Sequence, residues 1–199
     1  MSIKQKVIAI DGPSASGKGT VASRVAEALG FLYLDSGALY RLTALYAQKH
    51  NVAWTDEDTV STLTETLPAQ FEGSAVLLNG EDVSEQIRTE AIGMGASAVA
   101  QLPKVRAALL QRQRDFLTEK GLVADGRDIG SVIFPDAALK IFLTASANVR
   151  AQRRAKQLGI PCEGVAFERI LSDIEARDEA DRRRPVAPLK QLPDALLLD

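Results

Sequence analysis

A glycine-rich segment between a short apolar run and a helical pattern constrains this chain more than any other feature. The β-branched run Val7-Ile8-Ala9-Ile10 is followed by Asp11 and then by the segment Gly12-Pro13-Ser14-Ala15-Ser16-Gly17-Lys18-Gly19-Thr20. Apolar residues recur at helical spacing over 18–29, and Gly30 marks the end of that helix. A second strand over 31–34 and a helix that starts at 35–37 follow. This order predicts the opening of a parallel α/β sheet.

The residues of the glycine-rich segment are those of a phosphate-binding loop (P-loop). Glycines let successive backbone N–H groups curl around a phosphate, the helix N-terminus adds positive potential, and Lys18 can reach the outer phosphates of a nucleoside triphosphate. The strict pattern has Ser or Thr directly after the lysine, whereas here Gly19 intervenes and Thr20 comes one position late. Ser16 and Thr20 are therefore both candidates for the hydroxyl that faces Mg²⁺.

The rest of the chain extends the predicted sheet and interrupts it once. Further core strands are predicted over 121–126, 139–144 and 195–199, which gives five in all. Asn79-Gly80 is a strong hairpin signal, so we expect residues 70–84 to form a small antiparallel insert. Two helices are predicted over 89–118, the second starting at Pro103. Charged helices are predicted over 147–183, broken by glycines at 159 and 164.

Composition excludes several classes of protein. Apolar residues make up 46% and charged residues 25% of the 199, as in ordinary globular proteins. With one cysteine (Cys162) and one histidine (His50), intramolecular disulfides are excluded and His- or Cys-based metal sites are not expected. The sequence has no run of about 18 apolar residues and no signal-peptide pattern, so we expect no membrane partner and a cytosolic location. A monomer is the default expectation.

Charge is balanced overall but not locally. The formal net charge is −2, yet residues 51–90 carry nine acidic residues and one basic residue, which leaves the remainder at +6. Nucleic-acid-binding proteins usually show a basic patch and a high isoelectric point, so a nucleic-acid partner is not expected. The pattern suits a protein that binds small, multiply charged anions through a few arginines. A solvated acidic face explains most of the acids in 51–90 equally well.

Polar residues gather in three further stretches, which we expect at the C-terminal ends of core strands. These stretches are 34–41, 125–128 and 177–185. Open α/β sheets bind ligands at that edge, and the planar guanidinium of arginine makes bidentate bonds to phosphate. Asp125, at the end of a predicted strand, could hold Mg²⁺ through water. Two alternatives involve no ligand: a solvated helix face at 177–184, and a simple turn ion pair between Arg127 and Asp128.

These stretches together resemble the bacterial cytidylate kinases over essentially the whole chain. The resemblance rests on residues 10–20, 34–41, 80–89, 125–137, 140–143 and 177–189. It implies a P-loop NTPase three-layer sandwich that transfers a phosphoryl group from ATP to CMP or dCMP, with Mg²⁺. It also implies a core (about 1–48, 90–150 and 186–199), an acceptor-binding insert (about 49–90) and a lid with charged helices (about 150–185). Such chains usually continue past the counterpart of Leu197-Leu198-Asp199 with a helix that we expect to cover one core face.

The resemblance also implies roles for individual residues. ATP would be bound by the whole loop, namely Gly12, Pro13, Ser14, Ala15, Ser16, Gly17, Lys18, Gly19 and Thr20. The acceptor phosphate would be held by Ser36, Arg41, Arg127 and Arg184, the cytosine by Ser97, Arg106 and Asp128, and the sugar side by Arg177 and Asp181. Lys18, Arg127, Arg184 and Arg154 would act on the transferring group, with Arg153 as an alternative to Arg154. Thr20 and Asp125 would face Mg²⁺, partly through water.

Elementary chemistry makes the implied base site reasonable. Cytosine has an amino donor beside ring acceptors, so Asp128 can accept from the amine while Arg106 donates to the carbonyl or the ring nitrogen. Uracil would place a carbonyl against Asp128, and a buried polar group left unpaired costs about 1–3 kcal/mol. Two alternatives remain: a P-loop kinase for another small acceptor, and a nucleotide-dependent switch with no acceptor. A panel of acceptors separates the three.

Overall fold

The protein is described by a computed structural model that covers residues 5–72 and 75–199. The chain forms two compact units, one made of 1–34 and 116–199 and the other of 35–115. No helix within the described residues is both long enough and apolar enough to cross a bilayer. The functional division into core, insert and lid remains a prediction.

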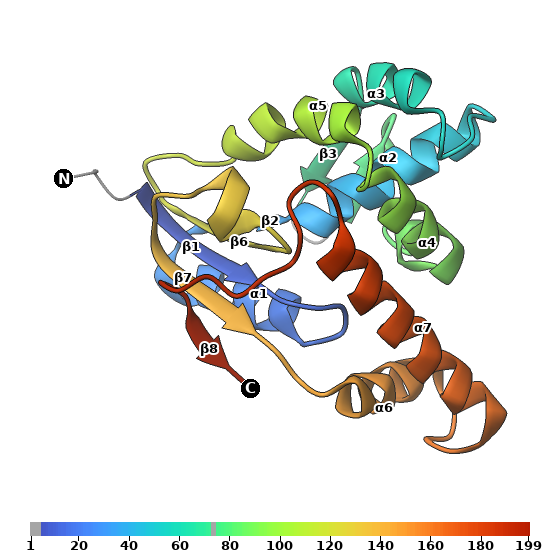
Figure 1. Ribbon diagram of the computed structural model, residues 1–199. Coiled ribbons are helices and arrows are strands. Elements are labelled where there is room, and N and C mark those ends of the chain that lie inside the picture. Colours follow the sequence, from blue (N-terminus) through green and yellow to red (C-terminus); the bar gives the residue numbers. More distant parts are fainter. Residues whose placement is uncertain (1–4, 73–74) are drawn as a thin grey trace. The chain divides into compact units, whose positions relative to one another are not determined.

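The first unit is built on a five-stranded sheet with the order β2-β6-β1-β7-β8. Parallel pairing joins β1 to β6 and β7, and β7 to β8. The strands are β1 (Gln5–Asp11), β2 (Leu32–Asp35), β6 (Leu122–Gly126), β7 (Ala137–Leu143) and β8 (Leu196–Leu198). The five predicted core strands and their parallel α/β arrangement are therefore confirmed. After the last helix, the chain returns along the sheet to reach β8 (Figure 1).

Helix α1 (Lys18–Leu29) packs on this sheet through small side chains. Ala22 and Ala26 of α1 are buried against Ile10 of β1 and Val123 of β6. The first unit also contains the π-helix η2 (Ile129–Ile133), α6 (Ala147–Leu158) and α7 (Gly164–Arg183). Ala151 and Ala155 of α6 form a second cluster with residues of α7. The charged helices predicted over 147–183 are confirmed, with the break between 158 and 164.

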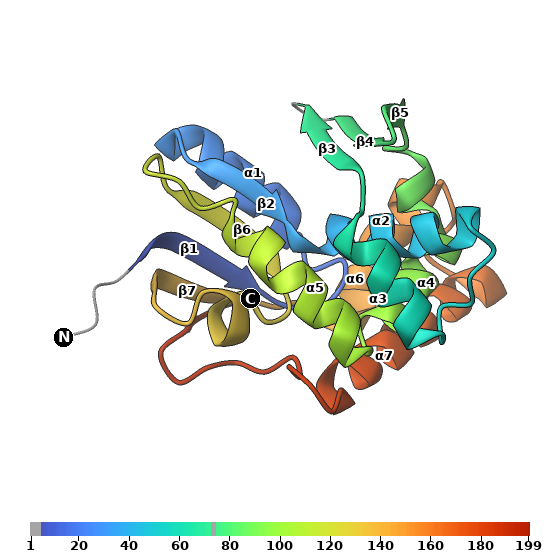
Figure 2. The same ribbon diagram turned by 90° about the horizontal axis from the view of Figure 1, so that it is seen from above.

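The second unit combines helices with a small antiparallel sheet of order β3-β4-β5. Its elements are α2 (Ser36–Lys49), α3 (Glu57–Glu65), β3 (Ala69–Glu72), β4 (Ala75–Leu78), β5 (Glu81–Asp82), the 3-10 helix η1 (Gln86–Arg88), α4 (Glu90–Val99) and α5 (Pro103–Arg114). Figure 2 shows the three strands to one side of the helices of this unit. The predicted insert is confirmed, and Asn79-Gly80 joins β4 to β5. Helix α3 was not predicted.

Close approach fixes two glycines of the fold. A Cβ on Gly12 would overlap the backbone carbonyl of Leu143, because the end of β1 runs directly against the end of β7. In the second unit, a Cβ on Gly95 of α4 would lie 2.5 Å from ring carbons of Trp54. The indole of Trp54 is itself held by a 2.9 Å hydrogen bond from Nε1 to the Ala44 carbonyl of α2. Gly95 therefore lets the α2–α4 pair close around the indole.

Candidate active site

The P-loop lies between β1 and α1, and its backbone has the curvature that phosphate binding requires. Ala15 (φ 56°) and Gly17 (φ 93°) both adopt left-handed conformations, and Gly17 is the N-cap of α1. Such alternation turns successive N–H groups toward a common centre, which is how a nest of amides binds an anion. The predicted strand–loop–helix context is therefore present.

Three side chains of the loop bear on ligand binding. The Lys18 ammonium donates to the Pro13 carbonyl at 3.3 Å, so it reaches back across the loop. The hydroxyl oxygens of Ser14 and Ser16 are buried, and neither has a hydrogen-bond partner among the described residues. A buried hydroxyl without a partner is costly, so these two groups are suited to a polar ligand in the loop.

Asp11, the last residue of β1, is a buried carboxylate directly before the P-loop. Asp11 accepts hydrogen bonds from the backbone N–H groups of Ile129 and Gly130, both at 2.8 Å. Burial raises the pKa of Asp11 to about 6 against the lowering effect of these two donors; the charge of Asp128 raises it further and Lys18 lowers it. Asp11 thereby anchors the start of η2, directly after Asp128. Sequence reasoning missed this anchor, although an acid between a strand and a P-loop was visible.

The residues predicted to face a metal ion differ in their surroundings. Asp125 is 4% exposed, and its Oδ1 accepts a 2.7 Å hydrogen bond from the Tyr33 hydroxyl. Gly19 lies beside it, since a Cβ there would be 3.9 Å from that same oxygen. Thr20 is exposed, whereas the Ser16 hydroxyl is buried. No group of three potential His, Cys, Asp or Glu ligands occurs in the described part of the chain.

The strongest concentration of positive charge in the predicted acceptor site surrounds Asp181. Arg127 Nε donates to Asp181 Oδ2 at 2.7 Å, joining the end of β6 to α7. Burial raises the pKa of Asp181, but the charge of Arg127 and its hydrogen bond, followed by the charges of Arg184 and Arg177, hold it below its usual range. Three predicted phosphate or sugar ligands thus share one carboxylate. Arginines gathered in this way are suited to binding an anion such as a phosphate.

The position predicted for the third polar stretch was wrong. Residues 177–183 are not at the end of a strand but on the last turns of α7, and Arg184 is the residue that ends this helix. Helical spacing, not a strand end, is therefore what places Arg177 and Asp181 on neighbouring turns. The solvated-face alternative holds only for part of the stretch, because Asp178 and Arg184 are 3% and 7% exposed while Arg182 and Arg183 are exposed.

The other predicted acceptor residues belong to the second unit. The Ser36 hydroxyl donates to Gln113 Oε1 at 2.6 Å, and both residues are buried. Arg41 donates to the Ile87 carbonyl at 2.8 Å. Arg106 is 7% exposed, donates to the Ala100 carbonyl at 3.2 Å and lies 5.7 Å from the centre of the Tyr40 ring. These contacts hold the polar side chains in defined positions within the unit. Gln113 was missed, because a glutamine on a helix gives no distinctive signal.

Ser97 and the two candidate lid arginines complete the set. The Ser97 hydroxyl donates to the Gly93 carbonyl at 3.2 Å, within α4. Arg153 on α6 donates to the Ser16 carbonyl of the P-loop at 2.9 Å. Arg154 is the next residue of the same helix, on a different face. The contact with the loop places Arg153 beside the P-loop, and the choice between Arg153 and Arg154 stays a prediction.

The comparison with family models decides the class of the chain: residues 8–199 match the model described as cytidylate kinase. The chain belongs to the cytidylate kinase family. A cytidylate kinase of Neisseria meningitidis serogroup C is 81% identical, in a match covering 98% of this chain and 90% of the relative. A cytidylate kinase of Chromobacterium violaceum is 61% identical, with coverages of 97% and 87%. The chain is accordingly a phosphotransferase of this family.

Among solved structures, the chain is similar to a gluconokinase from Sinorhizobium meliloti. The TM-score is 0.46 at 17% sequence identity, and the match covers 97% of this chain and 81% of the gluconokinase.

Proposed function

We propose that the protein transfers the γ-phosphoryl group of ATP to CMP or dCMP and releases ADP with CDP or dCDP. The observation that carries the proposal is the group of Arg127, Arg177 and Arg184 around Asp181 in the unit that also holds the P-loop. A kinase needs such a cluster to bind the phosphate of its acceptor in addition to the phosphates of ATP. The membership of the cytidylate kinase family supports the choice of acceptor.

In this proposal the P-loop binds the ATP phosphates through residues 12–20. Backbone N–H groups and the Lys18 ammonium neutralise the β- and γ-phosphates, and the buried Ser14 and Ser16 hydroxyls supply further hydrogen bonds. Asp125 and the hydroxyl of Ser16 or Thr20 would hold Mg²⁺, partly through water, and the ion would supply positive charge to the phosphate end of ATP. The Ser16 hydroxyl is buried in the loop, whereas Thr20 is exposed. Ser16 is therefore the better candidate for the hydroxyl at the phosphates of ATP.

The arginines act on the acceptor phosphate and on the group in transfer. Phosphoryl transfer leaves little covalent work for a protein, so positioning and charge stabilisation carry most of the catalysis. Arg127 and Arg184 bind both the acceptor phosphate and the phosphoryl group in transfer. Asp181 holds Arg127 in one orientation. Ser36 and Arg41 bind the acceptor phosphate, while Arg177 and Asp181 bind the sugar side. Arg153 or Arg154 of the lid contacts the transferring group.

The base is recognised in this proposal by Asp128, Arg106 and Ser97. Asp128 is 3% exposed and Arg106 is 7% exposed, so each would pair with the base away from bulk water. In such surroundings a mismatched carbonyl costs more than it would at an exposed site. The protein is further proposed to act as a monomer in the cytosol, which agrees with its single cysteine, Cys162.

The experiment that tests this function is an ADP-release assay with Mg·ATP and a panel of acceptors. The panel contains CMP, dCMP, UMP, AMP, GMP and shikimate. The proposal predicts turnover with CMP and dCMP that exceeds turnover with any other member by at least about tenfold. Preference for a different acceptor would keep the P-loop assignment but remove the roles of Asp128 and Arg106. Equal ADP release with and without every acceptor would instead indicate a nucleotide hydrolase or switch.

A further inference from the structure

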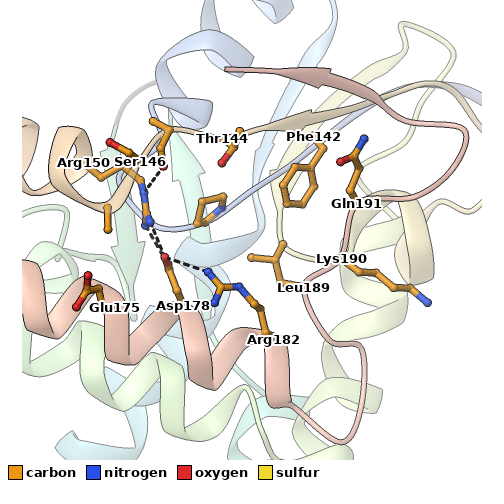
Figure 3. Close-up of a pocket in the computed structure, with 13 residues that line it drawn as sticks. Phe142, Thr144, Ser146, Arg150, Glu175, Asp178, Arg182, Leu189, Lys190 and Gln191 are labelled. Atoms are coloured by element: carbon orange, nitrogen blue, oxygen red, sulfur yellow. Dashed lines mark hydrogen bonds and ion pairs between the residues drawn. The ribbon is translucent and has the colours of Figure 1, made fainter.

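The most completely buried charged pair in the first unit lies beside the P-loop and has no role in the proposed function. Arg150 of α6 and Asp178 of α7 are each 3% exposed, and they form a bidentate ion pair. Arg150 Nη1 lies 2.9 Å from Asp178 Oδ1, and Nη2 lies 2.5 Å from Oδ2. Figure 3 shows the two side chains facing each other at one wall of a cavity of about 560 Å³.

Two further N–H groups of Arg150 donate to backbone carbonyls. Nε donates to the Ala145 carbonyl at 2.9 Å, and Nη1 donates also to the Ser14 carbonyl of the P-loop at 3.2 Å. The guanidinium therefore reaches from α6 into the loop while the Asp178 carboxylate holds its opposite edge. Arginine suits this position because its donors lie in one rigid plane.

Stability alone is a poor explanation for such a pair. Removing two charges from water costs several kcal/mol per ion, and apolar residues of similar volume often stabilise a fold as well or better. The helices α6 and α7 already share an apolar cluster that includes Ala151, Ala155, Phe167 and Ile174. What apolar residues could not supply is a hydrogen bond to the Ser14 carbonyl.

Peptide geometry explains why that carbonyl matters. No peptide in the described chain is cis, and in a trans peptide the C=O of one residue points away from the N–H of the next. With the Ser14 carbonyl directed at Arg150, the Ala15 N–H points to the opposite side of the loop. Arg153 acts in the same way on the Ser16 carbonyl and hence on the Gly17 N–H. The left-handed conformations of Ala15 and Gly17 lie at these two positions.

We propose that Arg150 is a positioning residue of the P-loop, oriented by Asp178, and that its bond to the Ser14 carbonyl turns the Ala15 N–H toward the triphosphate. The proposal rests on the proposed function in one respect, namely that the loop binds the phosphates of ATP. Arg150 itself need not touch the nucleotide. Asp178 acts through Arg150, and the acceptor cluster around Asp181 is not part of this device.

The test compares a charge-free pair with the native pair. In R150M/D178L both charges are removed together, so neither is left buried alone, and the Ser14 carbonyl loses its donor. The control is R182M, which makes the same change at an exposed arginine 3.7 Å from the outer side of the same carboxylate. Thermal unfolding verifies folding, and calorimetry measures the dissociation constants of a non-hydrolysable ATP analogue and of CMP.

The proposal predicts that folded R150M/D178L binds the ATP analogue about tenfold to a hundredfold more weakly, because hydrogen bonds to phosphate charge are lost when the loop relaxes. CMP binding should change by less than about threefold, and R182M should bind both ligands as the native protein does. Unchanged affinity for the analogue, or equal losses for the analogue and CMP, would overturn the proposal. Equal losses for the two ligands are the result that a general structural defect would produce.

A second variant keeps the test decisive if the double variant does not fold. D178N preserves the shape of the side chain but leaves one edge of Arg150 facing an amide donor. We expect analogue affinity to fall about threefold to tenfold, and native affinity in folded D178N would contradict the role of Asp178. Failure of the proposed function looks different: the native protein would bind the analogue but form no CDP. If the native protein bound no ATP analogue, both proposals would be wrong.

Discussion

The two units hold their predicted site residues in different ways. In the first unit, arginines pair with buried or half-buried carboxylates from other elements, as in Arg127–Asp181 and Arg150–Asp178. In the second unit, the contacts that fix Ser36, Arg41 and Arg106 are with an amide, backbone carbonyls and an aromatic ring. Charge pairing orients Arg127 and Arg150 through carboxylates of α7. Contacts with neutral groups fix the direction of Ser36 and Arg41, which are predicted to bind the acceptor phosphate, and of Arg106, which is predicted to bind the base.

The largest expected effect comes from breaking the charge pairing of the first unit at Arg127. In Arg127→Ala, kcat/KM for CMP should fall about a thousandfold, because an arginine that stabilises a transferring phosphoryl group contributes 10³ or more. ATP affinity should change by less than about threefold, since the P-loop residues are untouched. Steady-state kinetics and analogue binding measure the two quantities. Equal losses in both would remove Arg127 from the acceptor site, and Arg183→Ala, on an exposed turn of α7, is the matched control.

Asp11 differs from the two carboxylates of α7 described above. It is buried, but the hydrogen bonds described for it come from backbone N–H groups and not from an arginine. Its pKa of about 6 lies above the ordinary value of 3.8, so folding favours the protonated acid. The stabilising contribution is complete below about pH 4 and is lost as the pH rises through 6. The free energy of unfolding, relative to Asp11→Asn, should therefore fall by roughly 3 kcal/mol between pH 4 and pH 7.5. Denaturant unfolding at several pH values measures it, and a flat difference would contradict the assignment.

Asp128→Asn tests base recognition by a carboxylate of the first unit. An amide can turn its N–H₂ toward the uracil carbonyl, so discrimination between CMP and UMP should relax by about tenfold. The measurement is the ratio of kcat/KM for the two acceptors. Asp136→Asn, at an exposed position before β7, serves as the control. A CMP/UMP ratio unchanged in Asp128→Asn would exclude this residue from base readout.

The smallest expected effect concerns Gln113, which orients Ser36 in the second unit. Gln113→Met keeps the length of the buried side chain but removes the acceptor of the Ser36 hydroxyl. We expect KM for CMP to rise about threefold to tenfold while kcat falls less than twofold, because the variant loses the bond that orients Ser36 and one bond within α5, from Gln113 Nε2 to the Leu109 carbonyl. If KM for ATP rose in parallel, the variant would instead have disturbed the fold.

Sequence predicted the first unit better than the second, for physical reasons. The P-loop, the five core strands and the glycine stops at 30 and 159 are local signals that need no partner, and they lie close to where they were expected, whereas the third polar stretch does not. Helix α3 was missed because its acidic residues resemble a solvated loop, although Asp56 caps it through the Thr59 N–H. The roles of Asp11, Gln113, Arg150 and Asp178 depend on contacts between residues 28 to 136 positions apart. Such distant pairs leave no trace in local spacing.

One measurement tests the central claim most directly: the fate of the label from ATP carrying ³²P at the γ position, incubated with Mg²⁺ and CMP. Chromatography separates CDP from inorganic phosphate. The account predicts that nearly all transferred label appears in CDP and that omitting CMP abolishes its release. Label appearing in inorganic phosphate at a rate independent of CMP would contradict the account, because the arginines around Asp181 would then have no acceptor phosphate to bind.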